Sequence, residues 1–170
     1  MDRIQLGSTV DTLVRHSRVP VSNVRRRARS AYRHIVVATD FSDPALHALR
    51  LAAHWFGGSR QTLFHAYTPP WAVLTAGPVA DDSWRATMSQ QCESHLACAA
   101  LPQPIAAALH RVLEHGRTET LLSDYVASAD VDLVVLGSEG RSGLARALLG
   151  STAEGLLHAL DCDTLVVRGA

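Results

Sequence analysis

A spaced set of glycines is the part of this sequence best suited to chemistry. It runs Gly137-x2-Gly140-x9-Gly150-Ser151 and follows a short apolar stretch that predicts a β-strand. Glycine has no Cβ, so backbone N–H groups in such a turn can approach an anion closely. Ser151 and Thr152 then begin a predicted helix, whose first turn offers further N–H donors and partial positive charge. The spacing therefore predicts a site for a di- or triphosphate between a loop and a helix start.

This motif resembles the nucleotide loop of the universal stress protein family in its ATP-binding branch. That branch carries G-x2-G-x9-G-[S/T], and the sequence matches every fixed position. The plainer interpretation is a Gly/Ser connector, because glycine is common in turns between strands and helices. A Walker loop is excluded, since the chain has no G-x4-G-K-[S/T] and all its basic residues are arginine.

Alternating strand and helix patterns predict an open parallel sheet with helices on both faces. The predicted strands lie near residues 34–39, 61–66, 109–115, 132–136 and 164–168. The predicted helices lie near residues 44–56, 81–100, 119–128 and 152–160. The resemblance implies five parallel strands in the order 3-2-1-4-5, in a Rossmann-like, adenine nucleotide alpha hydrolase-like α/β fold. That order places Asp40 and Gly137 at the ends of adjacent strands, at the topological switch point where such sheets bind ligands.

The resemblance also assigns nucleotide-binding residues. Asp40 would hold the ribose or the base, with a turn or capping role as the alternative, and Ala66 would line the adenine site. The residues expected to cradle ribose and phosphates are Gly137, Ser138, Gly140, Arg141, Gly150, Ser151 and Thr152. Arg141 would neutralise phosphate charge, unless it is simply a solvated loop arginine. Glu139 stands where relatives often carry a basic residue or histidine, and its carboxylate is expected to repel phosphate.

The cofactor implied is ATP, which Mg²⁺ could accompany. The chain has no lysine for the phosphates and, apart from Glu139, no obvious general base beside the loop. We therefore expect a nucleotide-dependent stress-response module that is not an enzyme, has no catalytic residue, and changes assembly or partner contacts with ATP. The alternatives are a slow ATPase and a nucleotide-free interaction subunit of the same fold.

The N-terminal segment repeats the C-terminal one at an offset of 143 positions. The identical residues are Arg3, Leu6, Gly7, Ser8, Thr9, Leu13 and Arg25. An internal repeat changes the expected architecture. We interpret residues 1–28 as a partial universal stress domain of one helix and one strand, 29–33 as a linker, and 34–170 as a complete domain. A chance match and a remnant without a structural role are the alternatives.

The repeat also bears on assembly. By the resemblance, dimers of this family pair their last strands antiparallel, and an unpaired last strand is an open sheet edge. The segment around Val19 to Val24 is expected to pair with residues 164–168 in the same chain, as a pseudo-dimer, or to exchange between two chains. A homodimer through the last strand is the other expectation. Residues 161–164, Asp-Cys-Asp-Thr, depart from the Cys-Pro-Val usual before this strand.

Charge and composition limit the other partners. Residues 1–33 carry a net charge of +6 and residues 34–170 carry −6. We interpret the basic arm as solvated and expect no nucleic-acid partner, because the arm lacks interleaved aromatic residues. No apolar run approaches the ~18 residues of a membrane span, so no membrane partner is expected.

The cysteines indicate the cellular compartment and do not predict a metal site. Three cysteines without a signal peptide favour a reducing cytoplasm. Cys92, His95 and Cys98 lie three residues apart on a predicted helix and could face one ion. Because no fourth ligand is evident, we expect no metal site.

Overall fold

The structure is a computed structural model that describes residues 8–25, 30–68, 78–138 and 149–168. Six strands in these residues form one sheet in the order β1-β6-β5-β2-β3-β4. The strands are β1 (Val21–Asn23), β2 (His34–Ala38), β3 (Arg60–Tyr67), β4 (His110–His115), β5 (Leu133–Gly137) and β6 (Asp163–Val167). Neighbouring strands pair parallel except β1, which pairs antiparallel with β6.

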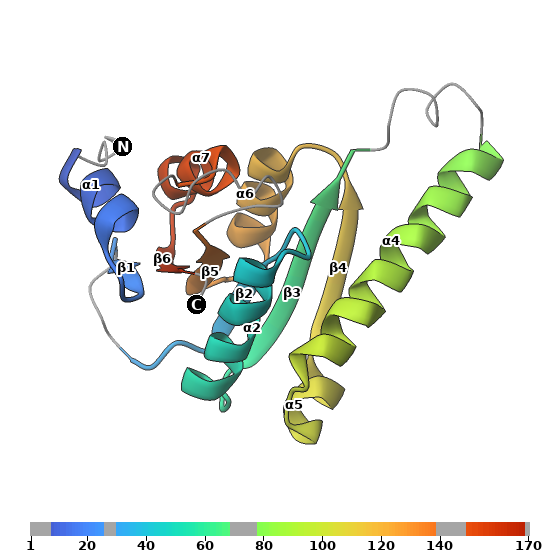
Figure 1. Ribbon diagram of the computed structural model, residues 1–170, viewed down its shortest axis with the longest axis horizontal. Helices are drawn as coiled ribbons and strands as arrows, with labels where there is room; N and C mark the ends of the chain where they lie inside the picture. The colour runs from blue at the N-terminus through green and yellow to red at the C-terminus, as the bar shows by residue number, and fades with distance from the viewer. Residues whose placement is uncertain (1–7, 26–29, 69–77, 139–148, 169–170) are drawn as a thin grey trace.

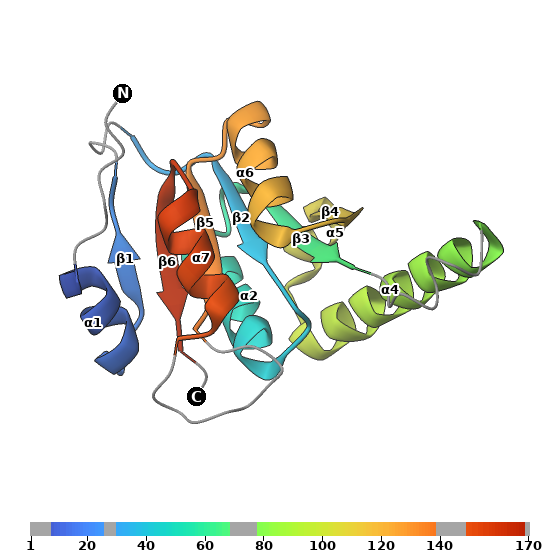
Figure 2. The same ribbon diagram turned by 90° about the horizontal axis from the view of Figure 1, so that it is seen from above.

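Helices cover both faces of the sheet (Figures 1 and 2). They are α1 (Ser8–His16), α2 (Asp43–Trp55), α4 (Pro78–Ala99), α5 (Gln103–Ala108), α6 (Thr118–Ser128) and α7 (Ser151–Ala159). The sheet has a hydrophobic core on each face. The core under α6 and α7 includes Val14 of α1, and the core on the other face packs against α2 and α4. Among the described helices, none is both long and apolar enough to cross a membrane.

The sheet confirms the predicted fold class and adds to it. The order β4-β3-β2-β5-β6 is the expected 3-2-1-4-5 arrangement of five parallel strands. The prediction of a five-stranded sheet was incomplete, because β1 adds a sixth strand beyond β6. Helix α5 was not predicted; it buries none of its residues, so its sequence carries no apolar periodicity.

Helix α2 shows how the local sequence sets an element beside the site. Ser42 is its N-cap and accepts a hydrogen bond from the Ala45 N–H, while Pro44 stands in the first turn. The buried face consists of Ala45, Ala48, Leu49, Ala52 and Ala53. The larger Leu46 and Phe56 are only partly buried, so the buried face of the helix is made mostly of small alanines. Alanine on this face lets the helix axis approach the strands closely.

The described part of the N-terminal segment contains one helix, α1, and one strand, β1. A shift of 143 positions carries the bounds of α1 onto those of α7. Val21 lies opposite Val166, and Val14 is buried in the core beside α7. We call residues 8–25, which comprise α1, β1 and Arg25, the half-unit.

The half-unit has three exposed apolar side chains on its open side. Leu13, Val19 and Val24 are 54%, 66% and 59% exposed. At the offset of 143 their counterparts are Leu156, Cys162 and Val167, each at most 2% exposed within the domain. The half-unit therefore presents to solvent the surface that the complete domain buries.

Asp163 fastens the half-unit to the domain. Its Oδ1 accepts a hydrogen bond of 2.7 Å from the Arg25 N–H, just after β1, and its Oδ2 accepts one of 2.9 Å from Tyr32 Oη, just before β2. Asp163 is 4% exposed. The unusual residues at 161–164 thus include an anchor for the segment that joins half-unit and domain.

Candidate functional site

The candidate site lies where β2 and β5 end side by side in the middle of the sheet. Ala38 pairs with Leu136, the last but one residue of β5. From β2 the chain crosses to β3 on one side, whereas β5 continues to β6 on the other. This divergence is the topological switch point, where the carboxyl ends of parallel strands leave a crevice for a ligand.

A cleft of about 270 Å³ opens at this point. Its volume is close to the lower end of the ~300–1,000 Å³ range of small-molecule sites. Its apolar wall consists of Ala38, Ala45, Phe64, Ala66, Leu136, Ala153 and Leu156. Its other lining residues are Thr39, Asp40, His65, Gly137, Thr118, Gly150, Ser151 and Thr152. An apolar wall facing a few polar groups suits a flat, partly polar ligand.

Asp40 follows β2 and lines this cleft. Its Oδ1 accepts hydrogen bonds from both the N–H and the Oγ of Ser42, at 3.0 and 2.5 Å. The carboxylate therefore shapes the turn into α2, as the capping alternative proposed, while also facing the cleft. The two interpretations of Asp40 are compatible.

The backbone beside Asp40 is strained. Phe41 has a φ of 64°, in the left-handed region that costs a residue with a Cβ about 1 kcal/mol or more. Its N–H donates to Thr39 Oγ1 at 2.9 Å, and its ring packs on His65 with centroids 4.2 Å apart. His65 Nδ1 in turn bonds the Thr39 carbonyl at 2.7 Å. Buried contacts thus hold the turn that presents Asp40.

The start of α7 forms another part of the rim. Gly150 is the N-cap, and no side chain caps the helix there. Because the first turn of a helix has no intrahelical acceptors for its N–H groups, Ser151 and Thr152 bring backbone donors without partners inside the helix, and partial positive charge, to the cleft. An anionic group would be stabilised here.

Ser138 connects β5, β6 and α7 without lining the cleft. Its N–H donates to the Val167 carbonyl at 2.8 Å, and its carbonyl accepts from the Gly150 N–H at 2.9 Å. Ser138 is buried, and no group in the described part of the chain bonds its Oγ. Its backbone fixes where α7 begins, so its role in the described structure is to position Gly150.

Gly137 is required by packing. A Cβ at this position would lie 3.0 Å from the Pro44 carbonyl carbon and 3.0 Å from the Ala45 nitrogen, both backbone atoms. The end of β5 therefore touches the start of α2. We had expected glycine here for the approach of an anion, and the close contact with α2 is a separate reason for it.

The structure brings most of the predicted binding residues together. Those that line the cleft are Asp40, Ala66, Gly137, Gly150, Ser151 and Thr152. Gly140 and Arg141 lie outside the described residues. The cleft is also lined by residues that are not among the predicted ones, including Thr39, Phe64, Thr118 and Leu136. The sequence indicated these residues only in part. Residues at the carboxyl ends of predicted parallel strands are expected to gather at one edge of the sheet.

The three residues weighed as metal ligands do not share one environment. Cys92 is buried in the core, His95 Nε2 lies 3.3 Å from Thr39 Oγ1, and Cys98 is exposed. Across the described residues, no group of three His, Cys, Asp or Glu side chains is placed to hold a metal ion.

Comparisons with known proteins agree with this architecture. Residues 31–168 match the sequence profile of the Universal stress protein family. A universal stress protein of Methanocaldococcus jannaschii is 25% identical over 156 residues, which cover 87% of this chain and 89% of that protein.

Solved structures share the fold. A universal stress protein from Archaeoglobus fulgidus superposes with a TM-score of 0.68 at 20% identity, covering 99% of this chain but 57% of that one. This chain thus spans little more than half of that structure. A universal stress protein in complex with cAMP superposes with a TM-score of 0.53 at 24% identity, covering 83% of this chain and all of that one.

Proposed function

The chain belongs to the universal stress protein family, and on this basis we propose that it binds ATP in the cleft between β2 and β5. Nucleotide occupancy would make it a sensor module of a stress response, with little or no catalysis. The observation that carries the proposal is that residues of the glycine motif and Asp40 line one cleft, although they lie about a hundred positions apart in the sequence.

The cleft offers complementary ends to a nucleotide. Phe64, Ala66 and Leu136 supply apolar surface for a base. The uncapped start of α7 supplies N–H donors for phosphate. Asp40, which also lines the cleft, would accept hydrogen bonds from ribose hydroxyls. That a related protein is described as a cAMP complex supports an adenine nucleotide as the ligand class.

Mg²⁺ would accompany ATP through the phosphates and not through a protein cage, because the described residues offer no acidic cluster. Hydrolysis would need a positioned base, and the described lining residues offer only Asp40 and His65 as groups that could accept a proton. Asp40 Oδ1 and His65 Nδ1 are both engaged with the backbone or side chains of their own turn. We therefore propose a binder, with a slow ATPase as the alternative outcome.

Assembly forms the second part of the proposal. The half-unit pairs with β6 in the same chain. We infer a pseudo-dimer within one chain in preference to a homodimer through β6. The three cysteines form no disulfide in the described structure, which fits a reducing cytoplasm as the location.

Calorimetric titration with ATP tests the nucleotide proposal. Asp40→Ala and Gly140→Ala should each weaken binding by about tenfold or more, the equivalent of about 1.4 kcal/mol. Gly58→Ala is the matched control, because a Cβ there meets nothing within 4 Å and the site is untouched. Turnover of ATP that disappears in Asp40→Ala would favour the ATPase. The absence of binding by the intact chain would favour the interaction subunit.

A further inference from the structure

A second cavity, of about 530 Å³, lies between α2 and α4, on the face of the sheet opposite to α6 and α7. Helix α4 diverges from α2 towards its own N-terminal end, which leaves space between the two helices (Figures 1 and 2). We call this cavity the groove. The groove and the cleft between β2 and β5 share no lining residue in the described part of the chain, so they are separate sites.

The wall that α4 contributes to the groove is polar. Thr87, Gln91, Ser94 and Cys98 follow one another at spacings of three or four residues, so they lie on one face of the helix, and Gln90 adjoins them. Amide and hydroxyl side chains can both donate and accept hydrogen bonds. Such a wall suits a ligand whose donors and acceptors alternate along its length, as they do along a peptide backbone.

The wall that α2 contributes combines charge with apolar surface. Asp43 is exposed and is the only acidic residue among the described residues that line the groove, and Leu46 lines it one turn further on. Arg50 follows Asp43 by seven residues, which is about two helical turns. It therefore lies on the same face of α2, about 10.5 Å further along the axis.

Arg50 stands where the groove ends at Cys98. Its Nε donates to the Ala99 carbonyl at 3.2 Å, and one Nη donates to the Cys98 carbonyl at 2.6 Å. These two bonds fix the guanidinium beside the groove. Because arginine has five N–H donors, the group can also bind a carboxylate.

From this arrangement we propose that the groove binds a short peptide of about three residues with free termini. The ammonium group of the peptide faces Asp43, its carboxylate faces Arg50, and an apolar side chain packs on Leu46. Three extended residues span about 10–11 Å, which agrees with the separation of Asp43 and Arg50 along α2. The proposal does not depend on nucleotide binding.

The inner wall of the groove belongs to the turn that presents Asp40 to the cleft. Phe41 and His95 line the groove, with ring centroids 5.4 Å apart. The opposite neighbour of the Phe41 ring is His65, at 4.2 Å, and His65 lines the cleft. A peptide in the groove therefore contacts side chains that hold this turn in place.

Titration of the full-length chain with the tripeptide Ala-Leu-Ala, followed by amide NMR spectra, tests the proposal. The shifts should be largest on the groove faces of α2 and α4 and should reach His65 through Phe41. The N-acetyl and the C-terminal amide forms of the tripeptide should each bind about tenfold more weakly, because each block removes one charge-assisted hydrogen bond.

Two variants assign the ends of the peptide. Asp43→Asn should weaken binding of the free tripeptide about tenfold and should leave the affinity for the N-acetyl form unchanged, since that form has no ammonium group to lose. Arg50→Gln should weaken binding of the free tripeptide to the same extent and should leave the affinity for the C-terminal amide unchanged. Thermal unfolding confirms that each variant is folded.

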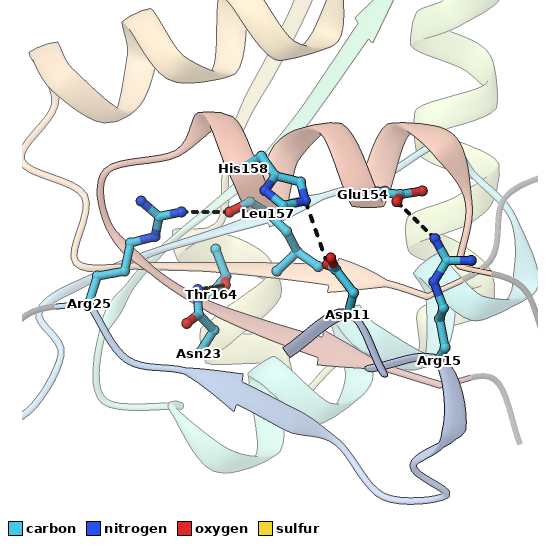
Figure 3. A network of polar contacts seen from close by, with 8 residues as sticks. All are labelled: Asp11, Arg15, Asn23, Arg25, Glu154, Leu157, His158 and Thr164. Carbon is cyan, nitrogen blue, oxygen red and sulfur yellow. Dashed lines mark hydrogen bonds and ion pairs between the residues drawn. The ribbon is translucent and has the colours of Figure 1, made fainter. Parts of the chain in front are cut away.

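Matched controls come from the half-unit. Asp11 lies 3.5 Å from His158, and Arg15 binds Glu154 at 2.8 Å, on the side of the molecule where α1 meets α7 (Figure 3). Asp11→Asn and Arg15→Gln remove the same charges as the two test variants, and Asp11 stands in the first turn of its helix as Asp43 does. Both controls should bind the tripeptide as the wild type does.

Thiol protection locates the peptide independently. Because Cys98 lines the groove and is exposed, saturating tripeptide should slow its reaction with a chromogenic disulfide reagent several-fold. Equal affinity for free and blocked tripeptides, unprotected Cys98, or no binding at about 10 mM peptide would each overturn the proposal. None of these measurements includes ATP, so a failure here and a failure of the nucleotide proposal are distinguished.

Discussion

Tyr32 Oη donates a hydrogen bond to Asp163 Oδ2, and this bond joins the segment before β2 to the start of β6. Burial, the hydrogen bond to Asp163 and the negative charge of Asp163 together raise the pKa of Tyr32 to about 12, with burial as the largest cause. The neutral phenol is therefore the form that the folded chain stabilises. Two consequences can be measured, one at neutral pH and one in alkali.

Tyr32→Phe should lower the free energy of unfolding by about 1–2 kcal/mol at pH 7, because it leaves a carboxylate oxygen without this donor. The folded pKa lies above the unfolded value of about 10, so the contribution of Tyr32 is complete below pH 10 and is lost as the pH rises toward 12. Urea unfolding of both proteins from pH 8 to 11.5 should show their stabilities converging in alkali. A constant difference would contradict the assigned cause.

Gly137→Ala should destabilise the fold by about 1–3 kcal/mol, because its Cβ would meet backbone atoms of Pro44 and Ala45 that cannot rotate away. The strand or α2 must shift, so ATP affinity should fall as well. Urea unfolding measures the first effect and calorimetry the second. Gly58→Ala should change neither the free energy of unfolding nor the free energy of ATP binding by more than a few tenths of a kcal/mol. An equal loss of stability in Gly137→Ala and Gly58→Ala would exclude the packing explanation.

Ala66→Phe should block the cleft while leaving the fold intact. Ala66 is partly buried and lines the cleft from the end of β3, so a phenyl ring there would occupy space predicted for the base. ATP binding should drop below detection, with thermal unfolding within a few degrees of wild type. Unchanged affinity would place the nucleotide elsewhere.

Thiol labelling checks the packing of the α4 face. Cys98 is exposed, whereas Cys92 and Cys162 are buried. Burial also raises the pKa of the Cys92 thiol, which lowers its thiolate fraction and its reactivity. A chromogenic disulfide reagent at pH 8 should modify one thiol rapidly in the native chain and three in denaturant. Cys98→Ser should remove the rapid phase, and a second rapid thiol would show that α4 opens.

The sequence predicted most of the sheet because strands such as β2 and β5 are buried apolar runs, followed by a helix-capping residue or a glycine. It predicted the extra helix and strand from identities such as Gly7 and Ser8, which repeat Gly150 and Ser151. Helix α5 was not predicted. None of its residues is buried, so its sequence shows no helical spacing of apolar residues. The antiparallel pairing of β1 could be predicted only from the repeat, because a strand of three residues has almost no sequence pattern of its own.

Among the residues that line the cleft, those in a sequence motif were predicted, and those brought there by the chain topology were not. Asp40 and Gly150 followed from type and spacing. Thr118 did not, because it reaches the cleft only through the crossover that sets α6 beside β3. The packing reason for Gly137 was also invisible, since it depends on how near α2 lies to β5. The spacing of Cys92, His95 and Cys98 suggested a shared face that tertiary packing divides between core and solvent.

The open side of the half-unit has a consequence for aggregation. Pairing with β6 moves the free edge of the sheet outward by one strand and does not remove it. The new edge is three residues long, so it offers few unpaired backbone groups as a template for further strands. Val19 and Val24 flank the strand, which carries no charged residue of its own, so its brevity is one of its protections against further pairing. Lengthening β1 would therefore make this chain prone to edge-to-edge polymerisation.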